Sequence, residues 1–123
     1  MLFKDDFYTI KGTSQEGEAT TFNVDISKNH SIFKGHFPGN PVTPGVAQME
    51  MVKELVSEVS GEPMNLISMG NCKFLAILNP EENNNVDVIL NINENEDQQL
   101  KVSAVIKNDE KSFLKMAAVY SKN

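Results

Sequence analysis

The alternation of hydrophobic and polar residues predicts strands over most of the chain. Apolar side chains occupy every second position in residues 86–92 and 100–106, which is the period of a strand with one buried face. Two short runs near the start are rich in β-branched and aromatic residues, and the polar residues 12–17 between them predict a turn. The expected strands cover residues 7–10, 19–26, 66–78, 86–92, 100–106 and 112–120.

One stretch has helical spacing instead. Apolar residues recur at intervals of three and four from about Pro44 to Val59, and the Ser-Gly-Glu-Pro sequence at residues 60–63 ends a helix. We expect Thr43 to be the N-cap, with Pro44 in the first helical position and Gly45 just inside the helix. The expected apolar stripe comprises Val46, Met49, Val52, Leu55, Val56 and Val59.

These elements indicate an α+β fold. A single apolar helix beside a mostly antiparallel sheet of about six strands is buried best when the sheet wraps around it. The chain has 123 residues, which favours one domain over residues 1–123.

Composition and charge narrow the function classes. Hydrophobic residues make up 40% and charged residues 23% of the chain, as in ordinary globular proteins. No apolar run approaches the roughly 20 residues of a membrane span, and residues 1–6 lack a signal-peptide pattern, so we expect a cytoplasmic protein. The net charge is −6 and arginine is absent, which argues against nucleic acid as a partner. An acidic protein partner would have to bind a local lysine patch.

The single cysteine, Cys72, excludes an internal disulfide and a cysteine-built metal site. Its apolar neighbours favour a small buried side chain over a nucleophile. We expect neither a metal site nor a cofactor.

Residues 35–46 contain three of the five prolines and three of the seven glycines, together with His36. This density favours a rigid, shaped loop, because proline fixes φ and glycine permits close approach of a ligand. An imidazole titrates near neutrality and can act as a general base. From the residues alone, a loop histidine that only binds the backbone remains an equal alternative for His36.

Gly45 lies where the helix begins. The first N–H groups of a helix have no internal partners and favour nearby negative charge, and a glycine lets a substrate carbonyl approach them. The alternative is that Gly45 only relieves crowding after Pro44, and the two interpretations are compatible.

Glu50 has no evident role within one chain. Helical periodicity places it beside Lys53, Glu54 and Ser57, away from the apolar stripe, so it reads as a solvated carboxylate paired with Lys53. His30 lies outside the Pro/Gly loop and is expected at the surface.

The sequence His-Phe-Pro-Gly-Asn-Pro-Val-Thr-Pro-Gly-Val at residues 36–46, with Glu50 fourteen residues after His36, resembles the signature of the β-hydroxyacyl-acyl-carrier-protein dehydratases. The resemblance implies the hot-dog fold, in which a sheet wraps a long helix. It also implies a homodimer, or a trimer of such dimers, with each active site built from two chains. The glutamate favours the plain dehydratase branch, because the dehydratase-isomerase relatives carry aspartate there.

The resemblance also implies a role for each site residue. His36 would remove the α-proton of a 3-hydroxyacyl thioester, the Gly45 N–H would polarise the thioester carbonyl, and Glu50 would protonate the departing hydroxyl. Phe37 and Val46 would contact the substrate. The acyl group would arrive on acyl carrier protein, and the product would be a trans-2-enoyl thioester.

The sequence departs from the family pattern at a few positions. Glu54 stands where glutamine is usual, and Ala47 and Gln48 stand where larger apolar residues are common. The acyl length, and the choice between fatty acid synthesis and polyketide or aryl-polyene pathways, stay open for this reason. For carrier-protein docking, Lys34 is the first candidate, and Lys73 and Lys115 are weaker ones.

Two other functions compete with this one. A hot-dog thioesterase would place a carboxylate to activate water, but such enzymes lack the His-Phe-Pro-Gly loop. A non-catalytic subunit that binds acyl chains or the carrier protein would not need both His36 and Glu50.

Overall fold

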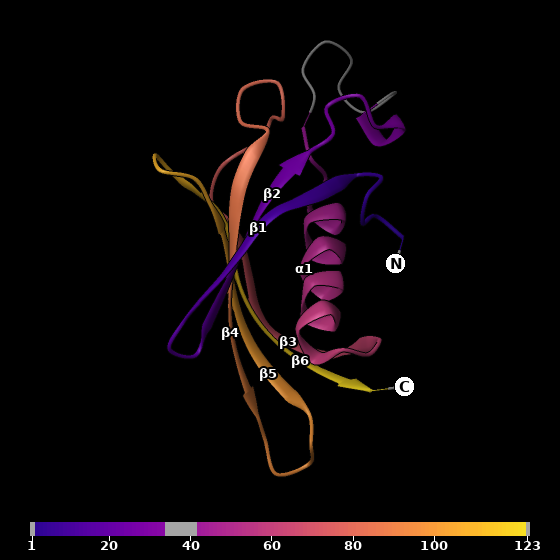
Figure 1. Cartoon of the computed structure of the whole chain (residues 1–123), viewed down its shortest axis with the longest axis vertical. Helices are drawn as coiled ribbons and strands as arrows, with labels where there is room; N and C mark the ends of the chain where they lie inside the picture. Colours follow the sequence, from indigo (N-terminus) through magenta and orange to yellow (C-terminus); the bar gives the residue numbers. More distant parts are fainter. Residues whose placement is uncertain (1, 34–41, 123) are drawn as a thin grey trace.

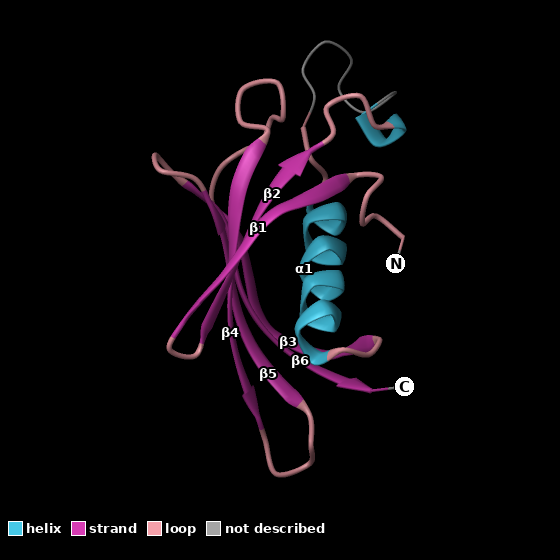
Figure 2. Cartoon of the chain, viewed as in Figure 1, coloured by secondary structure: helices cyan, strands magenta, loops and turns pink. Residues whose placement is uncertain are grey.

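The computed structural model describes residues 2–33 and 42–122. A single curved sheet lies along one long helix, α1, with both termini on the helix side (Figure 1). Colouring by secondary structure shows that strands dominate the rest of the described chain (Figure 2). The expected α+β architecture is therefore confirmed. The elements are β1 (Tyr8–Glu16), β2 (Ala19–Ile26), the 3-10 turn η1 (Ser31–Phe33), α1 (Gly45–Ser60), β3 (Met64–Phe74), β4 (Asn85–Glu94), β5 (Leu100–Lys107) and β6 (Ser112–Lys122).

The six strands form one antiparallel sheet in the order β1-β2-β4-β5-β6-β3. β1 and β3 are thus its edges. Helix α1 connects β2 to β3, and β3 lies at the opposite edge of the sheet from β1. β4, β5 and β6 follow as a meander and fill the space between.

The predicted turn over residues 12–17 is wrong, because most of it belongs to β1. Residues 12–16 pair with residues 19–23, and the chain reverses at Gly17 and Glu18. Gly17 has a φ of 62°, a left-handed conformation that glycine adopts without strain. The side chains of residues 12–16 are all exposed, so hydropathy carries no strand signal there. β3 also differs from expectation, beginning at Met64 and ending at Phe74.

The core lies between α1 and the inner face of the sheet. The helix contributes five fully buried apolar side chains, and β4, β5 and β6 supply alternate residues from the sheet. The predicted apolar stripe is only partly right, because Val46 is 75% exposed and Val59 is 42% exposed. The buried apolar residues of α1 are Ala47, Met51, Val52, Leu55 and Val56.

The predicted start of the helix is wrong by one residue. Pro44, with φ −59° and ψ 146°, is the N-cap, and Gly45 is the first helical residue. Thr43 does not cap, since it is 2% exposed and its Oγ1 has no hydrogen-bond partner among the described residues. Its N–H instead donates to the Leu78 carbonyl at 2.9 Å, which turns the residue inward. The predicted end is confirmed, because Gly61 is left-handed at φ 80° and its N–H donates to Ser57 O.

The expectation that His30 lies at the surface is wrong. Its side chain is only 12% exposed and its Nε2 lies 3.1 Å from Asp6 Oδ2. The ring meets Phe3 and Phe7 edge-on, with centroids 5.9 and 5.5 Å away. His30 therefore packs the segment after β2 against the segment before β1. The polar residues that surround it in the sequence gave no sign of this contact.

The end of β3 packs closely on the start of α1. A Cβ on Gly45 would lie 2.6 Å from Phe74 Cζ, which is well inside van der Waals contact. Gly45 therefore allows the aromatic ring of Phe74, from the edge strand β3, to approach the helix closely. This contact helps to fix the first turn of the helix against the sheet.

We expect Gly45→Ala to lower the free energy of unfolding by about 1 kcal/mol, because the new methyl group must displace the Phe74 ring. In a Phe74→Ala background the same substitution should cost nothing, which urea denaturation of all four proteins would measure as a coupling energy. An equal effect of Gly45→Ala in both backgrounds would show that Phe74 is not the obstacle.

Candidate active site at the helix N-terminus

Two of the predicted site residues, His36 and Phe37, lie outside the described residues, as does Lys34. The other three are on the first two turns of α1. Val46 and Glu50 are four residues apart and so share one face of the helix. Both line a cavity of about 270 Å³. The cavity is completed by Met49 and Lys53 of α1, Leu66 of β3 and Tyr120 of β6.

The first turn of the helix has N–H donors that no described residue satisfies. Ala47 N–H and Gln48 N–H donate to the Pro44 carbonyl at 3.0 and 3.1 Å. No hydrogen bond joins the amide nitrogen of Gly45 or Val46 to another described residue. These two N–H groups are at the positive end of the helix dipole, where a carbonyl oxygen that gains negative charge is stabilised.

Glu50 is less solvated than its position in the sequence suggests. Its side chain is 27% exposed, and the predicted pairing with Lys53 is present at 3.8 Å between Oε1 and Nζ. Partial burial raises the pKa of Glu50, and hydrogen bonding with Glu54 and the charge of that carboxyl raise it further, against the opposing effect of Lys53. A carboxyl with a raised pKa keeps its proton closer to neutral pH, as a general acid must.

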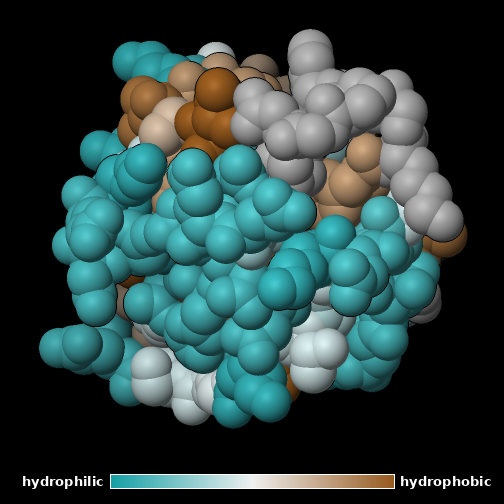
Figure 3. Space-filling view, turned by 90° about the horizontal axis from the view of Figure 1, so that it is seen from above, coloured by the Kyte–Doolittle hydropathy of each residue, from teal (hydrophilic) through white to brown (hydrophobic). Residues whose placement is uncertain are grey.

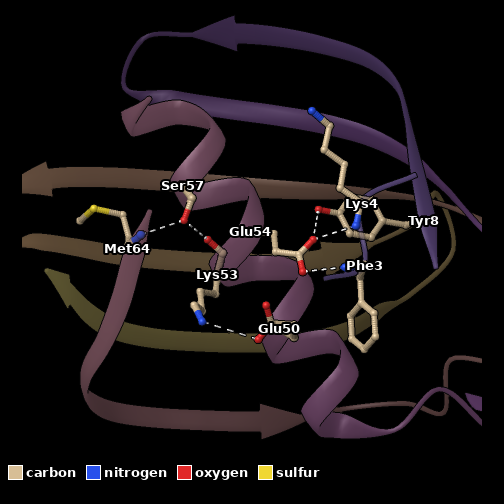
Figure 4. Close-up of polar contacts among 8 residues, drawn as sticks. All are labelled: Phe3, Lys4, Tyr8, Glu50, Lys53, Glu54, Ser57 and Met64. Carbon is tan, nitrogen blue, oxygen red and sulfur yellow. Dashed lines mark hydrogen bonds and ion pairs between the residues drawn. The ribbon is translucent and has the colours of Figure 1, made fainter. Parts of the chain in front are cut away.

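Glu54 is buried, which corrects its predicted place on a solvated face. It is 3% exposed. Its carboxylate accepts hydrogen bonds from Phe3 N and Lys4 N, both at 2.9 Å, and from Tyr8 Oη at 3.0 Å (Figure 4). Sequence reasoning missed these partners because they lie 46 to 51 residues away along the chain. Helical periodicity alone carries no signal for such a contact.

Glu50 and Glu54 also border a second, larger groove of about 670 Å³. Leu2 forms one wall, the outer face of α1 forms another, and the start of β3 closes the end. Four glutamates line it, namely Glu50, Glu54, Glu58 and Glu62. The groove and the smaller cavity meet at Glu50 and Lys53, which line both.

An apolar surface adjoins the cavity along the edge of the sheet. Among the described strands, only β6 pairs with β3, so the other side of β3 is an edge to which no described strand is paired. Seen along the molecule from above, the surface is mostly hydrophilic, and hydrophobic atoms gather towards one margin (Figure 3). An unpaired, apolar edge strand is typical of a surface that another chain covers. The exposed apolar residues of this region are Val46, Leu66, Ile67, Met69, Phe74, Leu75 and Ile77.

Residues 2–33 and 42–122 contain no helix that is long and apolar enough to cross a membrane. No group of three or more histidine, cysteine, aspartate or glutamate side chains there could hold a metal ion. Cys72, expected to be buried, is half-buried and is a free thiol.

Solved structures share this fold. One chain of the dehydratase heterocomplex ApeI:P from Xenorhabdus doucetiae superposes with a TM-score of 0.67 at 20% identity, covering 93% of this chain and 97% of the other. A mutant thioesterase from Staphylococcus aureus superposes with a TM-score of 0.68 at 16% identity, covering 95% and 94%. At such identities the likeness shows the fold alone. It is the expected hot-dog fold.

Sequence relatives are more specific. The chain is 34% identical to the 3-hydroxyacyl-acyl-carrier-protein dehydratase FabZ of Levilactobacillus brevis over 71 residues, which are 52% of this chain and 48% of that protein. It is 32% identical to FabZ of Oceanobacillus iheyensis over 81 residues, which are 60% and 58% of the two chains. The matched region thus spans about half the length of these curated relatives. The profile of the ApeI-like family, described as ApeI dehydratase, matches residues 12–116, and the chain belongs to this family of dehydratases.

Proposed function

We propose that the protein is a lyase that removes water from 3-hydroxyacyl thioesters on acyl carrier protein and gives trans-2-enoyl thioesters, in fatty acid synthesis or a related polyketide or aryl-polyene pathway. The observation that carries the proposal is the carboxyl of Glu50, partly buried and with a raised pKa, in a cavity beside the open N-terminus of α1. The FabZ relatives and the ApeI-like family are named for the same reaction type.

The elimination needs three groups. The α C–H must be acidified, a base must take its proton, and an acid must protonate the leaving hydroxyl. The N–H groups of Gly45 and Val46 can polarise the thioester carbonyl without a metal, because the helix dipole favours the developing oxyanion. Glu50 is the acid. His36, from the motif that precedes the helix, is the base.

The described chain leaves the site unfinished, and a second copy completes it in this proposal. The cavity at Glu50 opens beside the unpaired, apolar edge of β3. Pairing of two β3 edges would bury this surface and enclose the cavity. Each site would then combine Glu50 of one protomer with His36 of its partner. The ApeI chain of known structure occurs in a heterocomplex with ApeP, so a different subunit on this edge is the alternative outcome.

A single assay separates the candidate reactions. The protein is incubated with a 3-hydroxyacyl thioester of acyl carrier protein, and enoyl absorbance and free thiol are followed together. Enoyl product without thiol supports a dehydratase. Thiol release would mean a thioesterase, the activity of the neighbour from Staphylococcus aureus. No product at all would favour a binding subunit.

We expect Glu50→Gln to lower kcat by about 10²–10⁴-fold, because glutamine keeps the shape but has no acidic proton. Glu62→Gln is the matched control, since Glu62 lines the larger groove with Glu50 and forms an ion pair with Lys122. The control should keep the wild-type rate. Full turnover by Glu50→Gln would remove Glu50 from the mechanism.

Mixing two inactive variants tests the shared site. A heterodimer of His36→Ala and Glu50→Ala chains contains one intact site, so up to about half of the activity of the heterodimer fraction should return. Native mass spectrometry on chains of different mass would confirm subunit exchange. Exchange without recovered activity would show that both residues act within one chain.

Carrier-protein docking should depend on the pair Lys73 and Lys115, which face each other across β3 and β6 beside the Phe74 end of the site. Opposed like charges on one face of a sheet are unfavourable unless an anion or acidic partner lies near. We expect the double charge reversal to raise KM for the carrier-bound substrate and to spare a small thioester surrogate. Lys101→Glu, further along β5, is the control. An equal loss on both substrates would mean that the pair supports the fold.

A further inference from the structure

Glu54 joins the segment before β1 to the middle of α1. Its Oε2 accepts from Phe3 N, and its Oε1 accepts from Lys4 N and Tyr8 Oη. These donors belong to one stretch, residues 2–8, which we call the N-terminal segment. Figure 4 shows Phe3, Lys4 and Tyr8 converging on the Glu54 carboxylate, with Glu50 one turn away on the same side of the helix.

The contacts fit an ionised Glu54. Backbone N–H groups can only donate, so both carboxylate oxygens serve as acceptors, as in the charged form. No lysine or histidine of the described residues lies within ion-pair distance of Glu54. Lys4, whose N–H bonds Glu54, uses its ammonium group on Glu58 at 2.7 Å. A hydrogen-bonded carboxylate with no described lysine or histidine in ion-pair contact therefore lies beside Glu50.

Among the described residues, Lys53 is the cation in contact with Glu50, at 3.8 Å. Its charge and that of the N-terminal amino group both lower the pKa of Glu50. Tyr8 of β1 and Tyr120 of β6 also interact with Glu50. Burial raises the pKa of Tyr120 to about 12 and raises that of Tyr8 further, so both phenols are neutral at ordinary pH. The half-buried Cys72 has a raised pKa for the same reason and is a neutral thiol.

We propose that Glu54 is a positioning residue for the dehydration. Its carboxylate accepts hydrogen bonds from the N-terminal segment and holds the neighbouring Glu50 in the protonated form that acts as the acid. The inference rests on the proposed function for its catalytic meaning, but the proton on Glu50 is a property of the folded protein. Glu54 itself touches no substrate. The N-terminal segment thereby becomes part of the acid site.

Carbon-13 NMR of the glutamate side-chain carboxyls tests this directly. In Glu54→Gln the titration midpoint of Glu50 should fall by about one pH unit, because a neighbouring like charge is lost. In Glu62→Gln, which removes a charge from the same groove, the midpoint should stay. An unchanged Glu50 midpoint in a folded Glu54→Gln protein would overturn the proposal.

The wild-type protein provides a check that no folding defect can obscure. Two interacting carboxyls release their protons in two steps, and under the proposal the step at higher pH should appear mainly at the Glu50 carboxyl carbon. If that step appears mainly at Glu54, the proton is on the wrong residue and the proposal fails.

The pH dependence of kcat/KM links the effect to turnover. Glu50 must be protonated to act, so the rate falls on the basic side as Glu50 ionises. Losing the Glu54 charge should move this basic limb to lower pH by the same shift that NMR records, whereas a merely structural role would lower the rate at every pH. Failure of the proposed function would give a different result. The Glu50→Gln protein would then turn over at the wild-type rate, while the titration midpoint of Glu50 would still shift in Glu54→Gln.

Discussion

Burial of the Glu54 carboxylate requires the chain to bring three hydrogen-bond donors to one point on the helix. An unmatched buried charge costs several kcal/mol, and removing one partner from a matched one costs nearly as much. Two of the donors are backbone N–H groups of Phe3 and Lys4, which only a substitution by proline would remove. The third is the hydroxyl of Tyr8, the first residue of β1. One side chain thus fixes the N-terminal segment, the edge of the sheet and the helix relative to one another.

That arrangement divides α1 into faces with different surroundings. One face, with Met51, Val52 and Leu55, is buried in the sheet. Another side carries Val46, Glu50 and Glu54, each four residues from the next. Its Glu54 end is covered by the N-terminal segment, and its Val46 end, with Glu50, borders the cavity beside β3. The described chain thus covers one end of this side and leaves Val46 exposed at the other.

The parts of the fold that follow from local sequence pattern were predictable, and the parts that depend on distant partners were not. β4 and β5 alternate because one face is buried, and the helix ends at Gly61 because a left-handed residue is needed there. The extension of β1 to Glu16 is held by backbone pairing with exposed side chains on both faces, which hydropathy cannot register.

The candidate site divides in the same way. The motif that contains His36 is recognisable from sequence alone, and so is Glu50 by its spacing from that motif. The partial burial of Glu50, the contact between Gly45 and Phe74, and the burial of His30 against Phe3 and Phe7 all depend on residues brought together by folding. Glu54 is the clearest case, because a charged residue on a helix is assigned to solvent unless its partners are known.

Opposing effects act on the pKa of Glu50. Lys53 favours the carboxylate, and so does the helix dipole, but the dipole weakens beyond the first turn and Glu50 lies in the second. Lys53 is itself partly exposed and lies at the long end of ion-pair distance, where solvent screens the attraction. Burial and the Glu54 carboxylate act in the opposite direction, and the net effect is a raised pKa. In the proposed mechanism the first turn stabilises negative charge on a carbonyl at Gly45, while Glu50, one turn later, supplies the proton.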